Sequence, residues 1–268
     1  RLYYNRAPKG RFDIYVYDLA AKEERKVTFD LRAKDPAVSP DGKQIAFVRN
    51  EDGTNNIALM NVDGTRIRYL THHNDATQYF GPRWSPDGKR IAFSVFRGQD
   101  RDIAVIRADA EPFRKIRSKA DSSKTFPDSL AYADNAGFEA LIRTRADERD
   151  PCWLPDGSGL VFASDRTGIF NIFEYELAGR NVRQVTNVLG GAFSPSVSPS
   201  GEEVCYAGFH AANYSLYRVK RAEARPAPGL TQVDRDYRRT YTGDPVDKAY
   251  KVGRYGTHLV LSGVEPIV

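Results

Sequence analysis

The sequence predicts an all-β propeller, and two observations lead to this fold class. A short motif recurs four times, in which an apolar strand meets a Pro-Asp-Gly or Pro-Ser-Gly turn and a second apolar strand follows. The prolines that begin these turns stand at residues 40, 86, 155 and 199, so the steps between copies are 46, 69 and 44 residues. A repeat in the forties that carries several short strands is typical of propeller blades.

The turn chemistry explains why each copy folds as a hairpin. In the clearest copy, Ser85-Pro86-Asp87-Gly88 runs into Ile91-Ala92-Phe93. Proline presets φ, aspartate caps its own backbone, and glycine accepts the positive φ that ends the turn. The strand after the turn carries a large apolar residue at every other position, as a strand packed between sheets requires.

The chain accommodates five antiparallel blades of four strands, the first of them partial. Blade 1 lacks an inner strand, because Leu2–Arg6 aligns with the second strand Ile45–Arg49 of the next copy. The expected third strands are 12–18, 56–60, 102–106, 171–175 and 214–218, and the expected fourth strands are 25–28, 68–71, 138–144 and 183–186. A sixth blade is either missing or completed by other residues.

The propeller is expected over residues 1–233, with an insertion at about 110–137 that makes the third blade longer than the others. We expect this insertion to be a solvated loop or a docking element, to project from the face opposite His72 and His210, and to be dispensable for folding. Residues 234–268 are expected to form a linker followed by a closing strand at His258–Ser262, or to begin a following domain. Because residue 1 is arginine inside a strand pattern, we expect a processed product or a fragment.

Composition excludes several classes of protein. The net charge of +5 is spread along the chain and no recognition motif accompanies it, so we expect no nucleic-acid partner. No apolar run approaches the roughly 18 residues that a membrane helix requires. Two cysteines are too few for a disulfide scaffold, and we expect Cys152 and Cys205 to be small, buried and unpaired.

The repeated motif resembles the TolB-type WD-like β-propeller repeat. The resemblance lies in P-x-W-S-P-D-G-x-x-I-A-F, then D-I or N-I opening a strand, then L-T or V-T, and it covers about residues 1–220. Proteins with this repeat include TolB itself, other periplasmic and outer-membrane-associated bacterial proteins, and propellers attached to serine peptidases. The resemblance implies a periplasmic or cell-envelope location and protein partners. TolB has six blades and an additional α/β domain, neither of which this sequence displays.

Loops that lie far apart in sequence should gather on one face of the propeller, where the second strands end and the inner strands begin. The candidate binding residues on this face are Arg97, Arg101, Asp165, Arg166, His72 and His210. The same alignment adds Arg6, Arg11, Glu51, Asp52, Asp100, His73, Asp75, Gln78 and Glu148. Rigid scaffolds often present such loops to proteins or peptides, although mixed charge on loops is also typical of a solvated surface.

The favoured hypothesis is a non-catalytic scaffold for protein–protein binding in the bacterial cell envelope, without a cofactor. The alternative is the propeller domain of a larger peptidase or of an outer-membrane protein, whose other domains lie outside this sequence. A third hypothesis is a propeller lyase or hydrolase that uses the histidine-bearing face. The sequence contains no G-x-S-x-G nucleophile elbow and no metal-ligand spacing around its four histidines, so we expect neither catalytic residues nor a metal site.

Overall fold

The structure is a computed structural model, and it describes residues 1–8, 10–51, 53–72, 77–97, 100–110, 113–114 and 138–226. All of these residues belong to the first of two units into which the chain divides, Arg1–Asp234. The expected closing strand at 258–262 lies outside the described residues, as does most of the expected insertion.

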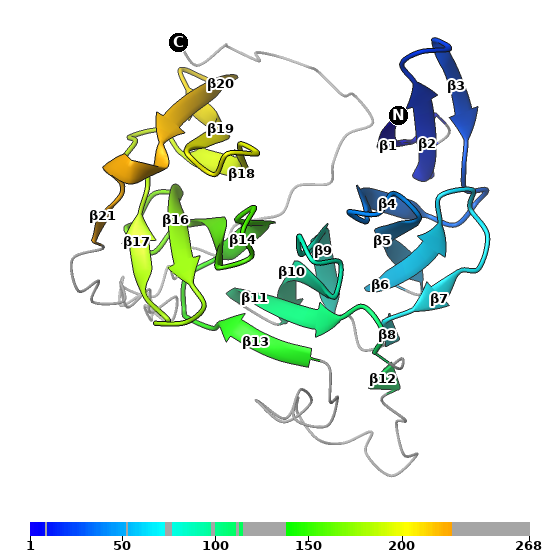
Figure 1. The fold of residues 1–268 in the computed structure, drawn as a ribbon, viewed down its shortest axis with the longest axis horizontal. Coiled ribbons are helices and arrows are strands. Elements are labelled where there is room, and N and C mark those ends of the chain that lie inside the picture. Colours follow the sequence, from blue (N-terminus) through cyan, green and yellow to red (C-terminus); the bar gives the residue numbers. More distant parts are fainter. Residues whose placement is uncertain are drawn as a thin grey trace, which may run out of the picture. The chain divides into compact units, whose positions relative to one another are not determined.

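The described residues form the β-propeller that the sequence predicts, with five antiparallel blades following one another in chain order (Figure 1). Among these residues, a single parallel pair, Asn55 with Gln78, joins the strands of blades 2 and 3 into one sheet. Blade 1 consists of β1 (Leu2–Arg6), β2 (Asp13–Asp18) and β3 (Glu23–Lys26). Blade 2 consists of β4 (Ala33–Val38), β5 (Gln44–Glu51), β6 (Thr54–Asn61) and β7 (Arg68–Tyr69). Blade 3 consists of β9 (Gln78–Trp84), β10 (Arg90–Arg97), β11 (Asp100–Arg107) and β13 (Phe138–Ile142).

The last two blades differ in how they end. Blade 4 consists of β14 (Glu148–Trp153), β15 (Gly159–Ser164), β16 (Asn171–Glu176) and β17 (Val182–Gln184). Blade 5 consists of β18 (Ala192–Val197), β19 (Glu203–His210) and β20 (Asn213–Lys220). After the short 3-10 helix η1 (Arg221–Glu223), β21 (Arg225–Pro226) pairs with β17 of blade 4. The described part of blade 5 therefore has three strands.

The apolar core lies between the blades rather than within them. Each strand sends alternate side chains to the blade before it and the blade after it. Ile45 and Phe47 pack against blade 1, whereas Ala46 and Val48 pack against blade 3. Four such clusters are described, and each combines residues of two consecutive blades. A single blade therefore cannot bury its own apolar faces.

The two tryptophans pack between neighbouring blades, as expected from their equivalent positions in the repeat. The Trp84 Nε1–H donates to the Ala37 carbonyl oxygen of blade 2 over 2.9 Å. The Trp153 Nε1–H donates to the Arg83 carbonyl oxygen of blade 3 over 3.1 Å. Each ring thus fills apolar space while its one polar atom is satisfied by the inner strand of the preceding blade.

Two dipeptides of the motif are hydrogen-bonded to each other. One opens the third strand, with the sequence D-I or N-I, and the other ends the fourth, with the sequence L-T or V-T. In blade 4, the Thr186 hydroxyl donates to Asn171 Oδ1 over 3.0 Å and accepts the Ile172 N–H over 2.8 Å. Thr28 in blade 1 and Thr71 in blade 2 make the same two bonds. This buried pair fastens the fourth strand to the third, which explains why the two dipeptides recur together.

The structure contradicts the predicted face for the first part of the insertion. Residues Phe113–Arg114 form β12, which pairs in parallel with β8 (Thr71–His72), and Arg114 lies opposite His72 in the register. The sequence predicts that the insertion projects from the face opposite His72. The physical reason for the difference is that β8 continues the outer edge of blade 2, where an unpaired backbone favours an added strand. The rest of the insertion lies outside the described residues.

The prediction that Cys205 is buried is also wrong. Cys152 is half-buried, but Cys205 is exposed, and both are free thiols. The residues at its repeat position in blades 2 and 3, Ala46 and Ala92, are fully buried because the following blade covers them. No described blade follows blade 5, so its corresponding face is open.

Among the described residues, no helix has the length and apolar character needed to cross a bilayer.

A candidate protein-docking face

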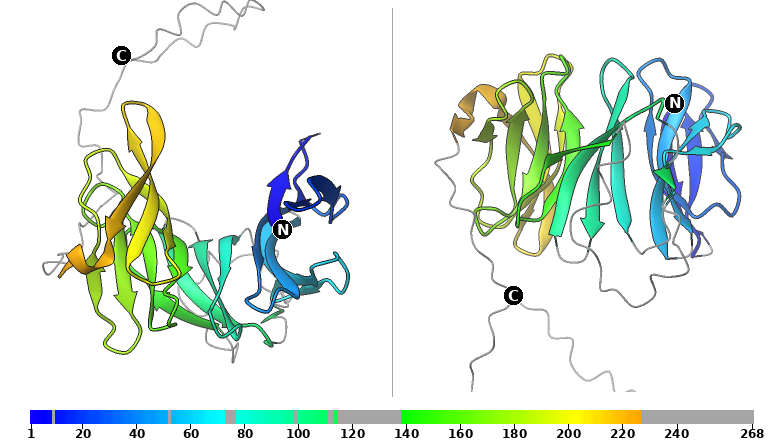
Figure 2. Two further views of the ribbon diagram at one scale, coloured as in Figure 1. Left: turned by 45° about the horizontal axis from the view of Figure 1, so that its top comes forward. Right: turned by 90° about the horizontal axis from the view of Figure 1, so that it is seen from below.

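One end of the propeller gathers the turns between second and third strands, and we call this end the hairpin face (Figure 2). It includes the hairpins β5–β6, β10–β11, β15–β16 and β19–β20. The segments that lead into the inner strands reach the same face. Gln78 Nε2 donates to the Gly53 carbonyl oxygen over 2.7 Å, and the Asp147 N–H donates to Asp165 Oδ1 over 2.9 Å.

Asp147 is the centre of an ion-pair network that joins blades 3 and 4 on this face. Arg149 forms a two-point pair with its carboxylate, and Arg101 Nε lies 3.7 Å from its Oδ1. The Arg101 guanidinium sits over the Phe80 ring at 4.3 Å, and the Arg149 guanidinium sits over the Phe170 ring at 4.4 Å. Each arginine is thus held between a carboxylate and an aromatic ring, which fixes its position before any partner binds.

Arg101 is the more strongly desolvated of these two groups. Burial lowers the pKa of the Arg101 guanidinium, and the nearby Asp147 carboxylate opposes that effect. Within the described residues, the Arg101 Nε atom is buried and has no hydrogen-bond acceptor, whereas the side chain as a whole remains 21% exposed. An arginine that is partly exposed, already desolvated and rigidly positioned is suited to bind an acceptor on another molecule.

Glu148 and Arg166 form a second, buried pair beside this network. Arg166 Nη2 donates to Glu148 Oε1 over 2.6 Å, and Thr144 donates to the same oxygen over 2.7 Å. The Glu148 side chain is fully buried, and its Oε2 has no hydrogen-bond partner among the described residues. Burial raises the pKa of the Glu148 carboxyl, outweighing the opposite effect of Arg166. We interpret this pair as a structural support beneath the hairpin face.

Each complete inner strand also contains a bulge at an X-Pro dipeptide. The residue before proline has positive φ in all four cases: Asp35 at 54°, Gly81 at 54°, Asp150 at 56° and Ser194 at 49°. Its N–H is bound by a side chain from the preceding blade, so that Gly81 donates to Asp35 Oδ2 over 3.4 Å and Ser194 donates to Asp150 Oδ2 over 3.1 Å. We call this series of bonds the bulge ladder.

The bulge ladder changes its acceptor group where the sequence requires it. Asn5 Oδ1 accepts the Asp35 N–H over 3.2 Å, because blade 1 has no described inner strand. Gly81 has no side chain with which to bind the next blade, and Ser94 Oγ accepts the Asp150 N–H over 3.2 Å instead. The ladder therefore links each inner strand to the preceding blade, twice through an inner-strand aspartate and twice through a side chain of the second strand.

The structure brings together three of the six candidate binding residues. Arg101, Asp165 and Arg166 lie within or next to the Asp147 network. Arg97 is placed by its backbone at the end of β10, opposite Asp100, and His210 is exposed at the end of β19. His72 is placed by its backbone at the end of β8. Among the residues whose side chains the structure describes, no hydrogen bond or ion pair joins His210 to the Asp147 network, and no group of three metal-ligating side chains occurs.

Sequence reasoning missed Asp147, Arg149, Phe80 and the bulge ladder. Asp147 and Arg149 flank the candidate Glu148 in sequence, but their pairing depends on how two blades pack. The bulge ladder had a visible signal, since Asp35-Pro36, Gly81-Pro82, Asp150-Pro151 and Ser194-Pro195 stand at the same position of every copy. A small or polar residue before proline in each inner strand indicates a recurring backbone distortion.

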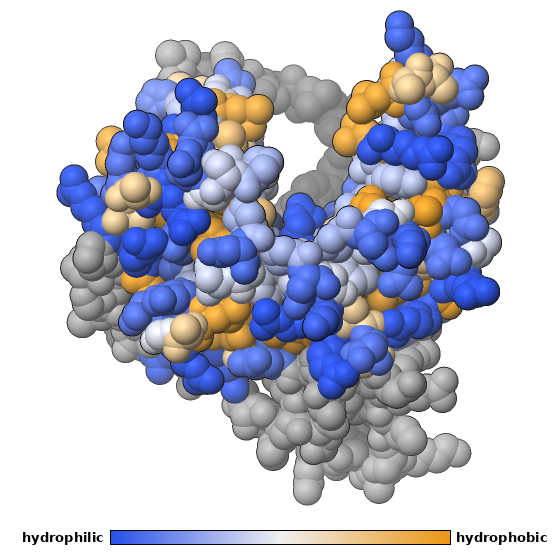
Figure 3. Space-filling view, viewed as in Figure 1, coloured by the Kyte–Doolittle hydropathy of each residue, from blue (hydrophilic) through white to orange (hydrophobic). Residues whose placement is uncertain are grey.

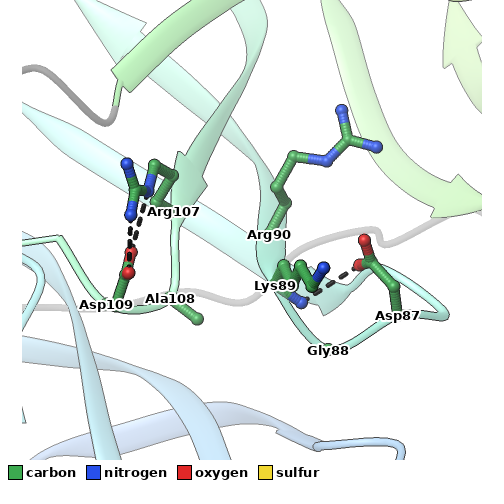
Figure 4. Close-up of a pocket in the computed structure, with 7 residues that line it drawn as sticks. All are labelled: Asp87, Gly88, Lys89, Arg90, Arg107, Ala108 and Asp109. Carbon is green, nitrogen blue, oxygen red and sulfur yellow. Dashed lines mark hydrogen bonds and ion pairs between the residues drawn. The ribbon is translucent and has the colours of Figure 1, made fainter.

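The opposite end of the propeller contains a hollow of about 450 Å³ between two turns of blade 3 (Figure 4). Four of its five charged side chains, those of Asp87, Arg90, Arg107 and Asp109, are already engaged. Arg107 pairs with Asp109 over 2.6 Å, and Asp87 Oδ1 accepts the Lys89 N–H within its own turn over 3.0 Å. Arg90 extends away over the Trp153 ring at 4.8 Å. This hollow therefore offers no convergent polar groups for a ligand.

Comparison with known proteins agrees with the architecture. The Tol-Pal system protein TolB of Francisella tularensis is 31% identical over 81 residues, which cover 29% of this chain and 19% of that protein. The crystal structure of TolB from Acinetobacter baumannii superposes with a TM-score of 0.62 and 21% identity, over 82% of this chain and 48% of the other. A protein described as TolB from Agrobacterium tumefaciens has the same TM-score with 24% identity, over 82% and 77% of the two chains. The chain has a TolB-like β-propeller fold.

This likeness is partial and concerns the fold. The matched segment spans only about a fifth of the length of the Francisella relative, and no family model matches the chain. A puromycin-hydrolysing peptidase of Mycobacterium tuberculosis also shares the fold, with a TM-score of 0.58 and 15% identity over 84% of this chain and 36% of that one. The propeller fold thus occurs in proteins with different activities.

Proposed function

We propose that this TolB-like propeller is a non-catalytic protein-binding scaffold of the bacterial cell envelope, and that the hairpin face is its docking surface. The observation that carries the proposal is the Asp147 network, in which Arg101 and Arg149 are held over aromatic rings at the boundary of two blades. Rigid, partly desolvated arginines and aromatic side chains are the groups that dominate protein–protein binding energy.

The envelope location and the class of partner rest on the relatives. The Francisella protein is named as part of a Tol-Pal system, and the TolB-type repeat that this sequence resembles occurs in periplasmic and outer-membrane-associated bacterial proteins. By this analogy the partner is another protein of the envelope, and association with the outer membrane would occur through that partner or through another domain. The proposal requires no cofactor.

Binding to purified Tol-Pal components from the same bacterium tests the proposal. Isothermal titration calorimetry should show an interaction that Arg101→Ala weakens about tenfold or more, since truncating a central arginine typically costs more than about 1 kcal/mol. Arg107→Ala is the matched control, because Arg107 forms an exposed pair with Asp109 away from the hairpin face. Equal losses in both variants, or no binding to any component, would contradict the proposal.

A second candidate is the propeller domain of a larger peptidase or outer-membrane protein. The likeness to the Mycobacterium peptidase motivates it, although at 15% identity that likeness concerns the fold alone. The mass of the mature protein isolated from its own cells, compared with 30.1 kDa for this chain, separates the two candidates. A much larger product carrying a hydrolase domain would favour the second.

A further inference from the structure

Two positions of the repeat supply most of the cationic and aromatic side chains of the hairpin face. The residue two places before the proline of each inner strand is Lys34, Phe80, Arg149 or Phe193. In the third strands, Ile57, Ile103, Ile172 and Leu216 share one repeat position. The residues two places before them are Asn55, Arg101, Phe170 and Tyr214. We call the seven cationic and aromatic residues of these two positions the cation–aromatic row.

Within each of blades 3 to 5, the two positions are in contact. The Arg101 guanidinium lies over the Phe80 ring at 4.3 Å in blade 3. In blade 4 the partners are reversed, and Arg149 of the inner strand lies over the Phe170 ring at 4.4 Å. In blade 5 both positions hold rings. The cation–aromatic contact therefore persists in blades 3 and 4 although its two partners exchange places.

Other contacts make the row continuous from blade 2 to blade 5. Lys34 Nζ of blade 2 lies over the Phe80 ring of blade 3 at 5.2 Å. The ring centroids of Phe170 and Phe193 are 5.0 Å apart across the boundary of blades 4 and 5, and those of Phe193 and Tyr214 are 6.2 Å apart. Between blades 3 and 4, the Asp147 carboxylate joins the two arginines.

Arg101 gives the row an unsatisfied cation. Its Nε lies 3.7 Å from Asp147 Oδ1, which is too far for a hydrogen bond, and has no acceptor among the described residues. Arg149, by contrast, is hydrogen-bonded to Asp147 at two points. Leaving a desolvated donor without an acceptor is costly, so an acceptor on another molecule would stabilise Arg101.

The blade 5 end of the row is aromatic and exposed. Tyr214 is 67% exposed, and the ring of Phe209, which is 37% exposed, lies 5.0 Å from it. The equivalent residue of blade 2, Asn55, is buried and accepts a hydrogen bond from Asn50. The row thus has cations in blades 2 to 4 and only rings in blade 5, so its two ends are suited to different side chains of a partner.

The opposite face is organised differently. Figure 3 views the propeller from the side of the Pro-Asp-Gly turns, and hydrophilic side chains cover most of that side. Carboxylates of these turns are satisfied locally, since Asp41 accepts a hydrogen bond from Ser39 and Asp87 accepts one from Ser85. The hairpin face instead combines an unsatisfied cation with exposed aromatic rings.

We propose that the cation–aromatic row binds an extended peptide segment of the partner, in which an acidic side chain pairs with Arg101 and an aromatic side chain packs on Tyr214 and Phe193. This inference rests on the proposed docking role of the hairpin face and specifies the partner's chemistry. The row holds three cations and one carboxylate, Asp147, so an acidic residue complements it. A guanidinium matches both oxygens of a carboxylate. Because the row crosses four blades, it fits several consecutive residues rather than one side chain.

Selection of short random peptides displayed on phage, with the full chain as target, tests the proposal. We expect the enriched peptides to combine Asp or Glu with Phe, Tyr or Trp. A synthetic consensus peptide should bind Arg101→Lys about tenfold more weakly than the unmodified protein, because lysine keeps the charge but loses the planar fork and the ring contact. Arg107→Lys is the matched control, since Arg107 lies at the other end of β11 in an exposed pair with Asp109.

A second variant tests the aromatic end. Tyr214→Ser should also weaken peptide binding about tenfold, whereas Leu19→Ser in blade 1, which removes an apolar side chain of similar exposure (65%), should not. Replacing the acidic residue of the peptide by its amide completes a double-mutant cycle. That change should be coupled to Arg101→Lys and additive with Tyr214→Ser.

Several results would overturn the proposal: enriched peptides without an acidic residue, no enrichment over an unrelated protein, unchanged affinity of Arg101→Lys, or additivity between this variant and the amide peptide. Failure of the wider function is distinguishable. A Tol-Pal component that binds the hairpin face but is not displaced by the consensus peptide would contradict this inference alone. A peptide that binds as expected, when no Tol-Pal component binds, would support the row and contradict the proposed envelope partner.

Discussion

Trp153 illustrates how a single side chain joins two blades. Its ring lies in the cluster shared by blades 3 and 4, its Nε1–H is bound by the Arg83 carbonyl oxygen, and the Arg90 guanidinium covers one ring face. These contacts come from both sides of one blade boundary. Removing the ring therefore leaves a cavity that neither blade can close without moving relative to the other.

Trp153→Ala should lower the free energy of unfolding by about 3–5 kcal/mol, the range for truncation of a buried tryptophan. Urea denaturation followed by far-UV circular dichroism measures the change. Trp153→Phe is the control, because it retains most of the apolar volume and loses the single hydrogen bond. A loss below about 1 kcal/mol for the alanine variant would show that the ring contributes little to the boundary.

Glu148 makes stability depend on pH. Burial raises the pKa of its carboxyl above the unfolded value of 4.5, so the folded state favours the protonated form. The stabilisation from Glu148 is therefore complete below about pH 4.5 and is lost as the pH rises through the folded pKa. Glu148→Gln removes this titration, and its stability relative to the unmodified protein should increase with pH above 4.5.

Denaturation curves of Glu148→Gln and of the unmodified protein between about pH 4 and pH 8 test whether their difference in stability grows with pH. Glu203→Gln is the control, because Glu203 lies in an exposed pair with Arg218 at 3.5 Å rather than in the buried pair. A relative stability of Glu148→Gln that stays constant or falls with pH would mean that Arg166, rather than burial, dominates the ionisation of Glu148.

At the scale of the element, the inner strand is defined by its bulge. The residue before proline has positive φ, which costs a non-glycine residue roughly 1–2 kcal/mol, and the side chain of Asp35 or Asp150 recovers part of that cost by binding the next blade. The bulge thus couples a local backbone distortion to the packing of consecutive blades.

Variants of Asp150 separate the cost of the positive φ from the stabilisation by the side-chain hydrogen bonds to Ser194. Asp150→Gly loses the bonds to Ser194 but relieves the steric cost of the positive φ that Asp150 bears, so we expect a net change in stability of less than about 1 kcal/mol. Asp150→Ala loses the same bonds and retains the steric cost, so we expect a loss of about 1–2 kcal/mol. Thermal or urea denaturation gives both values, and equal losses would show that backbone strain is unimportant here.

At the scale of the whole molecule, the placement of the core between blades implies cooperative unfolding. Each of the four clusters requires two blades, so an isolated blade would expose one or both of its apolar faces. Stability in such a repeat depends on the interfaces between neighbours. The described propeller should therefore behave as one folding unit.

Two probes test this expectation. Tryptophan fluorescence reports the boundaries at Trp84 and Trp153, and far-UV circular dichroism reports all strands. The two urea transitions should coincide, as they do in a two-state system. Separate midpoints would show that part of the propeller unfolds independently.

The sequence by itself determined the β-propeller, the number of described blades and most strand positions. Its Pro-Asp-Gly turns require specific backbone geometry, and Gly42 and Gly88 indeed have φ of 71° and 69°. The alternation of apolar residues is equally local, since neighbouring side chains of a strand always point to opposite faces. Such information is complete within a few residues, and it can be read without knowledge of the tertiary contacts.

Only the tertiary structure decided which side chains meet across blade boundaries. Asp147 binds Arg101 from a different blade, and the exposure of Cys205 depends on whether a further blade follows. The pairing of Arg114 with His72 likewise depends on where a free edge lies in space. Contacts of this kind join residues that are far apart in sequence, so no local pattern encodes them; they arise from the distance and twist between packed sheets.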